Sequence, residues 1–277
     1  MAYLIYLSIF IFGLCVGSFL NVVVYRLPKG IKISGGRSFC PNCNKKIIWR
    51  ENIPLFSYLF LKGKCSSCKR KISIQYPIIE LITGLLFLLA WRKISLLYFD
   101  STPYLIISLF YCFIIIAILI AIFFIDLKHY IIPDKLIIFG VIATIIYLGL
   151  TSLFLASKSV VLMNSSIIKH ILPMSFIRPT VFNNLFINNF IFAIIGVGFF
   201  GLLVLITKGK GMGMGDLKLA GLMGLMLGGG LIEAFYISFI TGAVLGLFLI
   251  ITNKKGLKSE IPFGPFLVFS TLALILI

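Results

Sequence analysis

The chain has 277 residues, of which 60% are hydrophobic and only 12% are charged, and its mean hydropathy is +1.14. This composition excludes an ordinary soluble globular protein and predicts an all-α protein that crosses a membrane several times. The 25 Lys and Arg against 8 Asp and Glu give a net charge of +17. In a soluble protein this charge would suggest nucleic-acid binding, but in a membrane protein it first indicates which side of the membrane each connecting segment occupies. We expect no nucleic-acid partner.

Eight segments are apolar enough to be membrane-spanning helices, because a span needs about 20 mostly apolar residues. They cover approximately residues 3–24, 77–91, 104–125, 133–155, 185–207, 217–227, 231–251 and 262–277. The second, sixth and eighth segments are short, which suggests a tilted or re-entrant path or a locally thinned membrane. The stretch 156–184, rich in Ser and Asn, is predicted to be an exposed outward loop.

The positive charges predict how these helices are oriented. With the N-terminus outside, four connecting segments fall on one face, namely residues 26–75, 126–135, 208–218 and 253–260. They hold 20 of the 25 Lys and Arg, and the positive-inside rule therefore makes this face cytoplasmic. The first span has no charged segment before it, and its positive charges follow the apolar run, so it is predicted to be a retained anchor rather than a cleaved signal peptide.

Three parts of the chain are predicted from this pattern. Residues 1–25 form the first transmembrane helix, residues 26–75 form a small cytoplasmic domain between the first and second spans, and residues 76–277 form the membrane-embedded domain. A segment of about 50 residues buries little apolar surface, so the small domain needs another source of folding free energy.

Four cysteines in the small domain form two CxxC knuckles, Cys40 with Cys43 and Cys65 with Cys68. Each knuckle can present two thiolates to one tetrahedral ion, so the spacing predicts a four-cysteine zinc site of the ribbon type. Redox disulfides are the alternative, but a cytoplasmic location keeps thiols reduced. Because four protein ligands leave no open position for water, we expect the zinc to be structural.

Three carboxylates lie at the predicted cytoplasmic ends of spans: Asp126, Asp134 and Asp216. Two carboxylates at the same depth on different helices can share a proton, and one can then activate water while the other acts as the acid. This arrangement is the chemistry of an aspartyl protease. The simpler alternative is that they are solvated helix caps.

A run of alternating glycines, Gly211, Gly213 and Gly215, precedes Asp216. Glycines there would let a peptide backbone come close, because they carry no side chain. A helix-packing surface is an alternative explanation, whereas the run does not fit a phosphate loop or a dinucleotide fingerprint.

Taken together, these residues resemble the type IV prepilin leader peptidase and N-methyltransferase family of GxGD-type membrane aspartyl proteases. The similar stretches are residues 17–28, the two knuckles, and residues 52–58, 63–65, 76–80, 126–134, 211–218 and 261–266. The resemblance implies that Asp126 and Asp216 are catalytic and that Asp134, Gly213, Gly215 and Lys218 support them.

The resemblance also implies two reactions at the bacterial inner membrane. The first removes a short basic leader from prepilins or pseudopilins at the cytoplasmic face. The second transfers a methyl group from S-adenosylmethionine to the new N-terminus, and the cysteine-bearing domain favours this bifunctional form. A basic leader is not attracted by a cationic face, so we expect the positive charges to contact anionic membrane lipid instead.

Other classes of function remain open at this point. The protein could be a peptidase without methyltransferase activity, a non-enzymatic scaffold that recruits components through the zinc domain, or a transporter in which the three aspartates relay ions. The sequence predicts no residues for the methyl-donor site and no oligomeric state.

Overall fold

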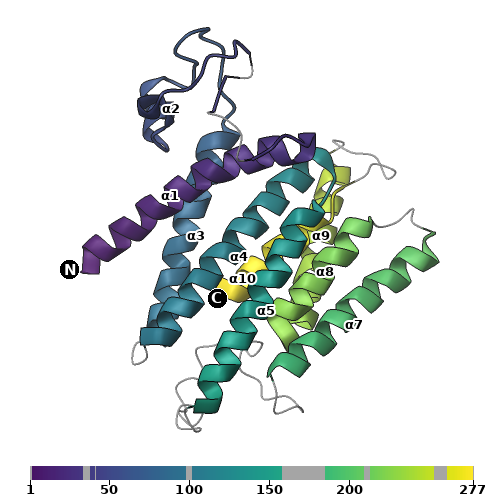
Figure 1. Ribbon diagram of the computed structural model, residues 1–277. Coiled ribbons are helices and arrows are strands. Elements are labelled where there is room, and N and C mark those ends of the chain that lie inside the picture. The colour runs from purple at the N-terminus through teal and green to yellow at the C-terminus, as the bar shows by residue number, and fades with distance from the viewer. Residues whose placement is uncertain are drawn as a thin grey trace.

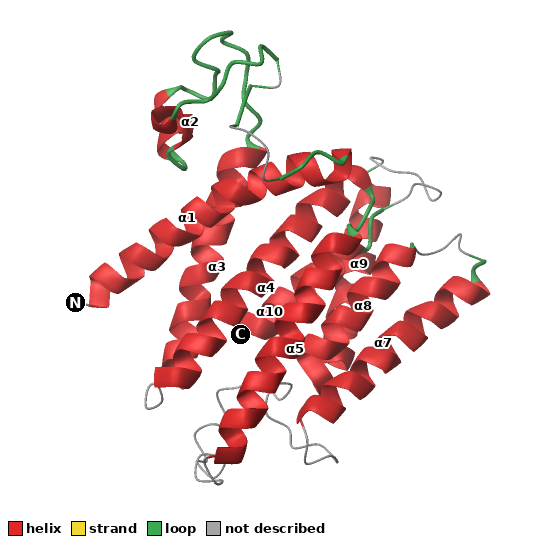
Figure 2. Cartoon of the chain, viewed as in Figure 1, coloured by secondary structure: helices red, strands yellow, loops and turns green. Residues whose placement is uncertain are grey.

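The computed structural model describes residues 2–33, 38–40, 42–97, 102–157, 185–208, 213–252 and 261–276. Within these ranges the chain consists of helices joined by loops (Figures 1 and 2). Residues 27–74, which carry the four cysteines and are called the four-cysteine segment, also contain isolated β-bridges. The predicted outward loop lies almost entirely outside the described residues, as do Gly211 and the connection 253–260. The all-α fold predicted from composition is confirmed.

Eight long helices coincide with the eight predicted segments in the described part of the chain. They are α1 (Ala2–Arg26), α3 (Gln75–Leu97), α4 (Thr102–His129), α5 (Asp134–Ser157), α7 (Leu185–Ile206), α8 (Met214–Leu227), α9 (Leu231–Ile251) and α10 (Gly264–Leu276). Among the described residues, five segments are long and apolar enough to cross a membrane, and one of these joins α8 and α9. The chain is therefore a multi-pass membrane protein.

Helices α3 and α4 extend furthest beyond the apolar runs that predicted them. Helix α3 has 23 residues because it also includes polar residues at both ends. Helix α4 continues through Asp126 to His129, so this aspartate lies in the last turn instead of ending the helix. The helix stops where Tyr130 adopts a left-handed conformation (φ 56°) and its N–H bonds to the Asp126 carbonyl oxygen (2.9 Å). Hydropathy marks the end of the apolar run, whereas backbone hydrogen bonding marks the end of the helix.

Helices α1 and α3 pack closely because small residues line their contact. A Cβ at Gly13 would lie 2.7 Å from Gly84 Cα, and a Cβ at Gly17 would lie 2.6 Å from Glu80 Cα. These two glycines are four residues apart and so share one helix face, as in close helix pairs within membranes. The first helix is thereby fixed against the rest of the bundle.

Helices α4 and α8 carry much of the core. Helix α4 packs against α1, α3, α5 and α10, and α8 packs against α5, α7 and α10. Their buried side chains include Ile116, Leu119, Ile122, Leu219 and Met223. Gly264 at the start of α10 lies against Asp126 at the end of α4. Ile132 lies against both Gly264 and Gly215 at the start of α8, so these three helix ends come together.

The four-cysteine segment extends from the end of the bundle where α1 ends and α3 begins (Figure 1). It contains the short helices η1 (Leu27–Lys29), η2 (Trp49–Asn52) and α2 (Phe56–Phe60). We call this end of the bundle the four-cysteine end. The end of α4 and the starts of α5, α8 and α10 lie at the same end.

Candidate metal centre and carboxylate pair

The two cysteine knuckles come together in the structure. The four sulfur atoms all lie within 4.8 Å of one another; they belong to Cys40, Cys43, Cys65 and Cys68. The Cys40 and Cys68 sulfurs are 3.9 Å apart. A tetrahedral ion with metal–sulfur bonds of about 2.3 Å would place its ligands about 3.8 Å apart. The four sulfurs could therefore hold one metal ion.

The two knuckles have the same backbone geometry. In each, the first cysteine N–H bonds to the carbonyl oxygen five residues later, Lys45 for Cys40 (3.0 Å) and Arg70 for Cys65 (2.9 Å). In each, the fourth residue after the first cysteine has a positive φ, 55° at Asn44 and 58° at Lys69. The repeated turn points both thiols of a knuckle to the same side.

The thiols differ in acidity. Backbone N–H groups of Cys68 and Ser67 lower the pKa of the Cys65 thiol to about 6. At Cys43 the backbone N–H of Lys45 favours the thiolate, but desolvation and the neighbouring thiols raise the pKa to about 11. Four close thiols therefore do not all ionise unless a cation lies between them, which fits the chemistry of a metal centre.

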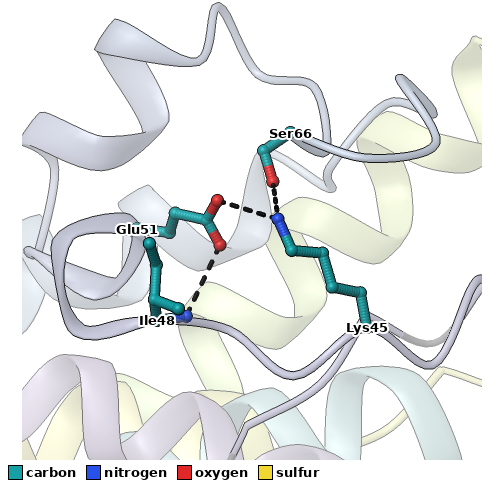
Figure 3. A network of polar contacts seen from close by, with 4 residues as sticks. All are labelled: Lys45, Ile48, Glu51 and Ser66. Atoms are coloured by element: carbon teal, nitrogen blue, oxygen red, sulfur yellow. Dashed lines mark hydrogen bonds and ion pairs between the residues drawn. The ribbon is translucent and has the colours of Figure 1, made fainter.

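A polar network links the knuckles to η2 (Figure 3). The Lys45 ammonium donates to Glu51 Oε1 (3.2 Å) and to the Ser66 hydroxyl (2.9 Å), and the Ile48 N–H donates to Glu51 Oε2 (3.5 Å). The Ser66 hydroxyl and Lys45 hold the pKa of Glu51 below its usual range. The Glu51 side chain is only 16% exposed, and its contacts come from both knuckles. The pairing depends on Ser66, which lies in the other knuckle.

A second carboxylate joins the four-cysteine segment to the membrane helices. Glu80 in α3 is buried, and its Oε2 accepts a hydrogen bond from the Leu55 N–H (2.8 Å), where Leu55 has a φ of 60°. Nearby, the Asn21 amide of α1 donates to the Tyr76 carbonyl oxygen (3.1 Å). The Glu80 contact fixes the residue that precedes α2 against α3, and the Asn21 contact joins α1 to the start of α3.

Asp126 and Asp216 are both buried, with 5% and 9% of their surface exposed. Asp126 lies in the last turn of α4 and Asp216 in the first turn of α8, close enough for their charges to interact. Each carboxylate accepts a hydrogen bond from a glycine backbone, Gly264 for Asp126 and Gly213 for Asp216. Gly213 is the N-cap of α8, so Asp216 reaches back to its own helix start.

Two glycines make room for this pair. A Cβ at Gly264 would collide with Asp126 Oδ2, and a Cβ at Gly215 would lie 3.0 Å from Ile132 Cβ. The Cβ that would be added at Gly264 also lies 3.3 Å from the Ile132 side chain. The Ile132 side chain therefore packs between the start of α8 and the start of α10. In the sequence, only the aspartates mark the stretch 126–134, and hydropathy offers no signal for this role of Ile132.

Asp134 and Lys218 form a separate ion pair. The Lys218 Nζ lies 2.6 Å from Asp134 Oδ1, and the Asp134 side chain is 62% exposed. This pair joins the first turn of α5 to α8 without entering the buried pair. The fold and these sites define a multi-pass membrane protein with two buried, neighbouring aspartates at the same end as a four-sulfur centre.

Comparison with known proteins gives the family. A family model described as the bacterial peptidase A24 N-terminal domain matches residues 11–94. A prepilin leader peptidase/N-methyltransferase of Legionella pneumophila is 32% identical over 96% of this chain and 89% of its own length. The protein of the same name from Bacillus subtilis is 31% identical over 93% and 88%. The chain belongs to the prepilin leader peptidase/N-methyltransferase family.

A further relative of that name, from Myxococcus xanthus, is 42% identical over half of this chain and 38% of its own length. The search of solved structures found no match. The resemblance inferred from the sequence motifs is confirmed.

Proposed function

We propose that the chain is a membrane aspartyl endopeptidase that removes the short basic leader of prepilins or pseudopilins. The observation that carries the proposal is the pair of buried carboxylates, Asp126 and Asp216, which lie on different helices and close enough to interact. The names of the relatives supply the substrate class.

In this mechanism the two carboxylates share one proton. The ionised carboxylate takes a proton from water, and the resulting nucleophile attacks the carbonyl carbon of the scissile peptide. The protonated carboxylate gives its proton to the carbonyl oxygen, and a proton then passes to the leaving amine as the C–N bond breaks. A carboxylate has two oxygens, so the hydrogen bond from Gly264 or Gly213 orients each group and leaves an oxygen for water or substrate.

Asp134, Gly213, Gly215 and Lys218 support the pair in this proposal. The Asp134–Lys218 ion pair holds α5 beside α8, and Gly215 lets Ile132 approach the start of α8. No step requires a metal, because carboxylates that divide the acid and base roles need no Lewis acid. The four cysteines would hold a structural zinc ion, and residues 26–75 would be the domain that depends on it.

We further propose that the catalytic end faces the cytoplasm at the bacterial inner membrane. In the topology predicted from the sequence, the segments on this face carry 20 of the 25 Lys and Arg, which supports that orientation. S-adenosylmethionine would supply the methyl group for the new N-terminus, a role supported by the names of the relatives. Proteolysis is assigned to residues 76–277.

The test compares three neighbouring carboxylates in the purified full-length protein. Asp126→Asn and Asp216→Asn should each reduce leader removal by about 10³-fold, because each removes a general acid or base. Asp134→Asn, which breaks only the exposed ion pair, should retain most activity. Mass spectrometry of a prepilin substrate measures leader loss and N-terminal methylation separately, and zinc content reports folding. Robust cleavage by either buried-pair variant would refute the mechanism.

A further inference from the structure

Helix α2 of the four-cysteine segment has one face turned away from the rest of the protein. Phe56, Leu59 and Phe60 share this face by their spacing, and 56%, 70% and 83% of their surfaces are exposed. The opposite side carries Tyr58, whose hydroxyl donates to the Ile72 carbonyl oxygen (3.4 Å) and packs against Gly63. Helix α2 therefore has one anchored face and one apolar face that the described residues leave exposed.

Neighbouring residues add an aromatic ring and two cations. Trp49 in η2 is 73% exposed, and η2 packs against α2. The Arg50 guanidinium lies 5.2 Å from the Trp49 ring centre, and Lys62, just after α2, is exposed. We call this set the aromatic-basic surface; it consists of Trp49, Arg50, Phe56, Leu59, Phe60 and Lys62.

The depth of this surface is set by Glu80. Helix α3 begins at Gln75, so Glu80 lies about 7–8 Å inside the helix at 1.5 Å per residue. The Leu55 N–H, directly before α2, is 2.8 Å from the Glu80 carboxylate. Helix α2 therefore starts at the level of the second turn of α3, which packs along α1, a helix long and apolar enough to span a membrane.

We propose that the aromatic-basic surface lies in the interfacial layer of the membrane that the protein spans and that it prefers anionic phospholipid. Aromatic rings partition to this layer, and Arg50 and Lys62 attract lipid phosphates. Because α1 and α3 already tether the segment to the membrane, docking is intramolecular and needs little intrinsic affinity. The proposal depends on membrane insertion and is independent of the proposed peptidase activity.

Charge and position favour lipid over a protein as the occupant. An apolar patch with a cationic edge is complementary to an anionic bilayer surface, and the Glu80 contact places the patch beside that surface. A second copy of the chain would bring Arg50 and Lys62 into contact with further cations. The test therefore includes a second copy and a substrate peptide as competing outcomes.

The test uses the fluorescence of Trp49. The chain has two tryptophans, so Trp91→Phe leaves Trp49 as the reporter in the full-length, zinc-loaded protein. The protein is reconstituted in vesicles of phosphatidylcholine alone or of phosphatidylcholine with phosphatidylglycerol. In the anionic vesicles, we expect Trp49 emission to shift to shorter wavelength, to be shielded from acrylamide, and to be quenched by lipids brominated near the headgroup.

Matched variants separate docking from folding. Lys62→Gln should reduce the ratio of docked to free segment about fivefold in anionic vesicles, since one cation near such a surface contributes that much. Lys71→Gln is the control, because Lys71 is also an exposed lysine but lies outside both the aromatic-basic surface and the two knuckles. The double substitution Leu59→Ser with Phe60→Ser should abolish the quenching of Trp49 by brominated lipid in both vesicle types. Zinc content, measured for every variant, identifies any loss of folding.

Three results would overturn the proposal. The first is equal acrylamide quenching in both vesicle types with no quenching by brominated lipid. The second is shielding that increases with the protein-to-lipid ratio, which would assign the surface to a second copy. The third is shielding that requires an added prepilin leader peptide, which would assign it to substrate.

Discussion

The four-cysteine segment and the buried carboxylate pair lie at the same end of the helical bundle, but different interactions hold them. In the segment, turns and hydrogen bonds between residues close in sequence shape each knuckle, and large apolar side chains such as Phe60 stay exposed. Around Asp126 and Asp216, close packing of α4, α8 and α10 buries both carboxylates. In the residues that the structure describes, the segment has no apolar core, whereas the pair depends on one.

This difference indicates how each region fails. A region without a core loses its structure when its ligand or its few polar contacts are removed. A closely packed region loses its geometry when a side chain is enlarged, because its neighbours have no space to move into. The two regions should therefore respond to different substitutions.

The largest effect is expected from loss of the metal ligands. Cys40→Ser should abolish zinc binding and unfold the four-cysteine segment, because zinc supplies about 10–16 kcal/mol to the folding of small four-ligand domains. Limited proteolysis and zinc analysis measure the outcome. Asp126→Asn is the control and should retain zinc.

Brief chelation should leave leader cleavage intact as long as the segment stays folded, because the carboxylate pair needs no metal. Rapid loss of cleavage with a folded segment would indicate a metalloprotease. Protease resistance of Cys40→Ser without bound zinc would show that the segment has enough core of its own.

The next largest effect is expected at Gly264. In Gly264→Ala the new methyl group collides with Asp126, which should cost about 1–3 kcal/mol of stability. Displacement of the carboxylate should lower cleavage by about 10²-fold. Gly198→Ala is the matched control, since a Cβ there meets open space. Thermal unfolding and cleavage rates are measured for both, and equal activity of the two variants would contradict the packing argument.

A smaller effect is expected where the two regions join. Glu80→Ala leaves the Leu55 N–H without its carboxylate, at a cost of about 1–3 kcal/mol. Hydrogen exchange in residues 53–60 should accelerate while zinc content stays unchanged. Glu80→Gln should restore much of the protection because it keeps an oxygen acceptor. Glu233→Ala, an exposed carboxylate on α9, should change nothing, and similar exchange in both Ala variants would exclude the tether.

The smallest effect is expected from Glu51. Ser66 and Lys45 lower the pKa of the Glu51 carboxyl in the folded protein. The ionised carboxylate therefore contributes its full stabilisation above the unfolded-state pKa of about 4.3. This stabilisation is lost as the pH falls through the lower pKa of the folded state. Glu51→Gln should lower stability by about 0.5 kcal/mol near neutral pH, and the difference from the parent should vanish in acid. Zinc-loaded protein is compared by thermal unfolding. When Lys45→Met is also present, the stability difference between proteins with and without Glu51→Gln should shrink. A stability difference that grows in acid would contradict the Glu51–Lys45 ion pair.

The sequence by itself determined the kind of fold, the metal-binding motif and the family. Long apolar runs predict helices wherever they occur, because an unpaired backbone group in hydrocarbon is too costly. A CxxC knuckle is equally local, since its turn positions both thiols within a few residues. The confirmed family resemblance likewise rests on motifs that are each short and contiguous.

Only the tertiary structure decided which of these residues meet. Gly264 lies 138 positions from Asp126, Lys218 lies 84 positions from Asp134, and Glu80 lies 25 positions from Leu55. Hydropathy places a residue at a depth in the membrane but not beside a particular neighbour, because the order of helices around a bundle depends on side-chain packing. For the same reason the sequence marked Asp126 and Asp216 as candidates, whereas the contact of Ile132 with Gly215 and the exposed face of α2 became visible only in the folded chain.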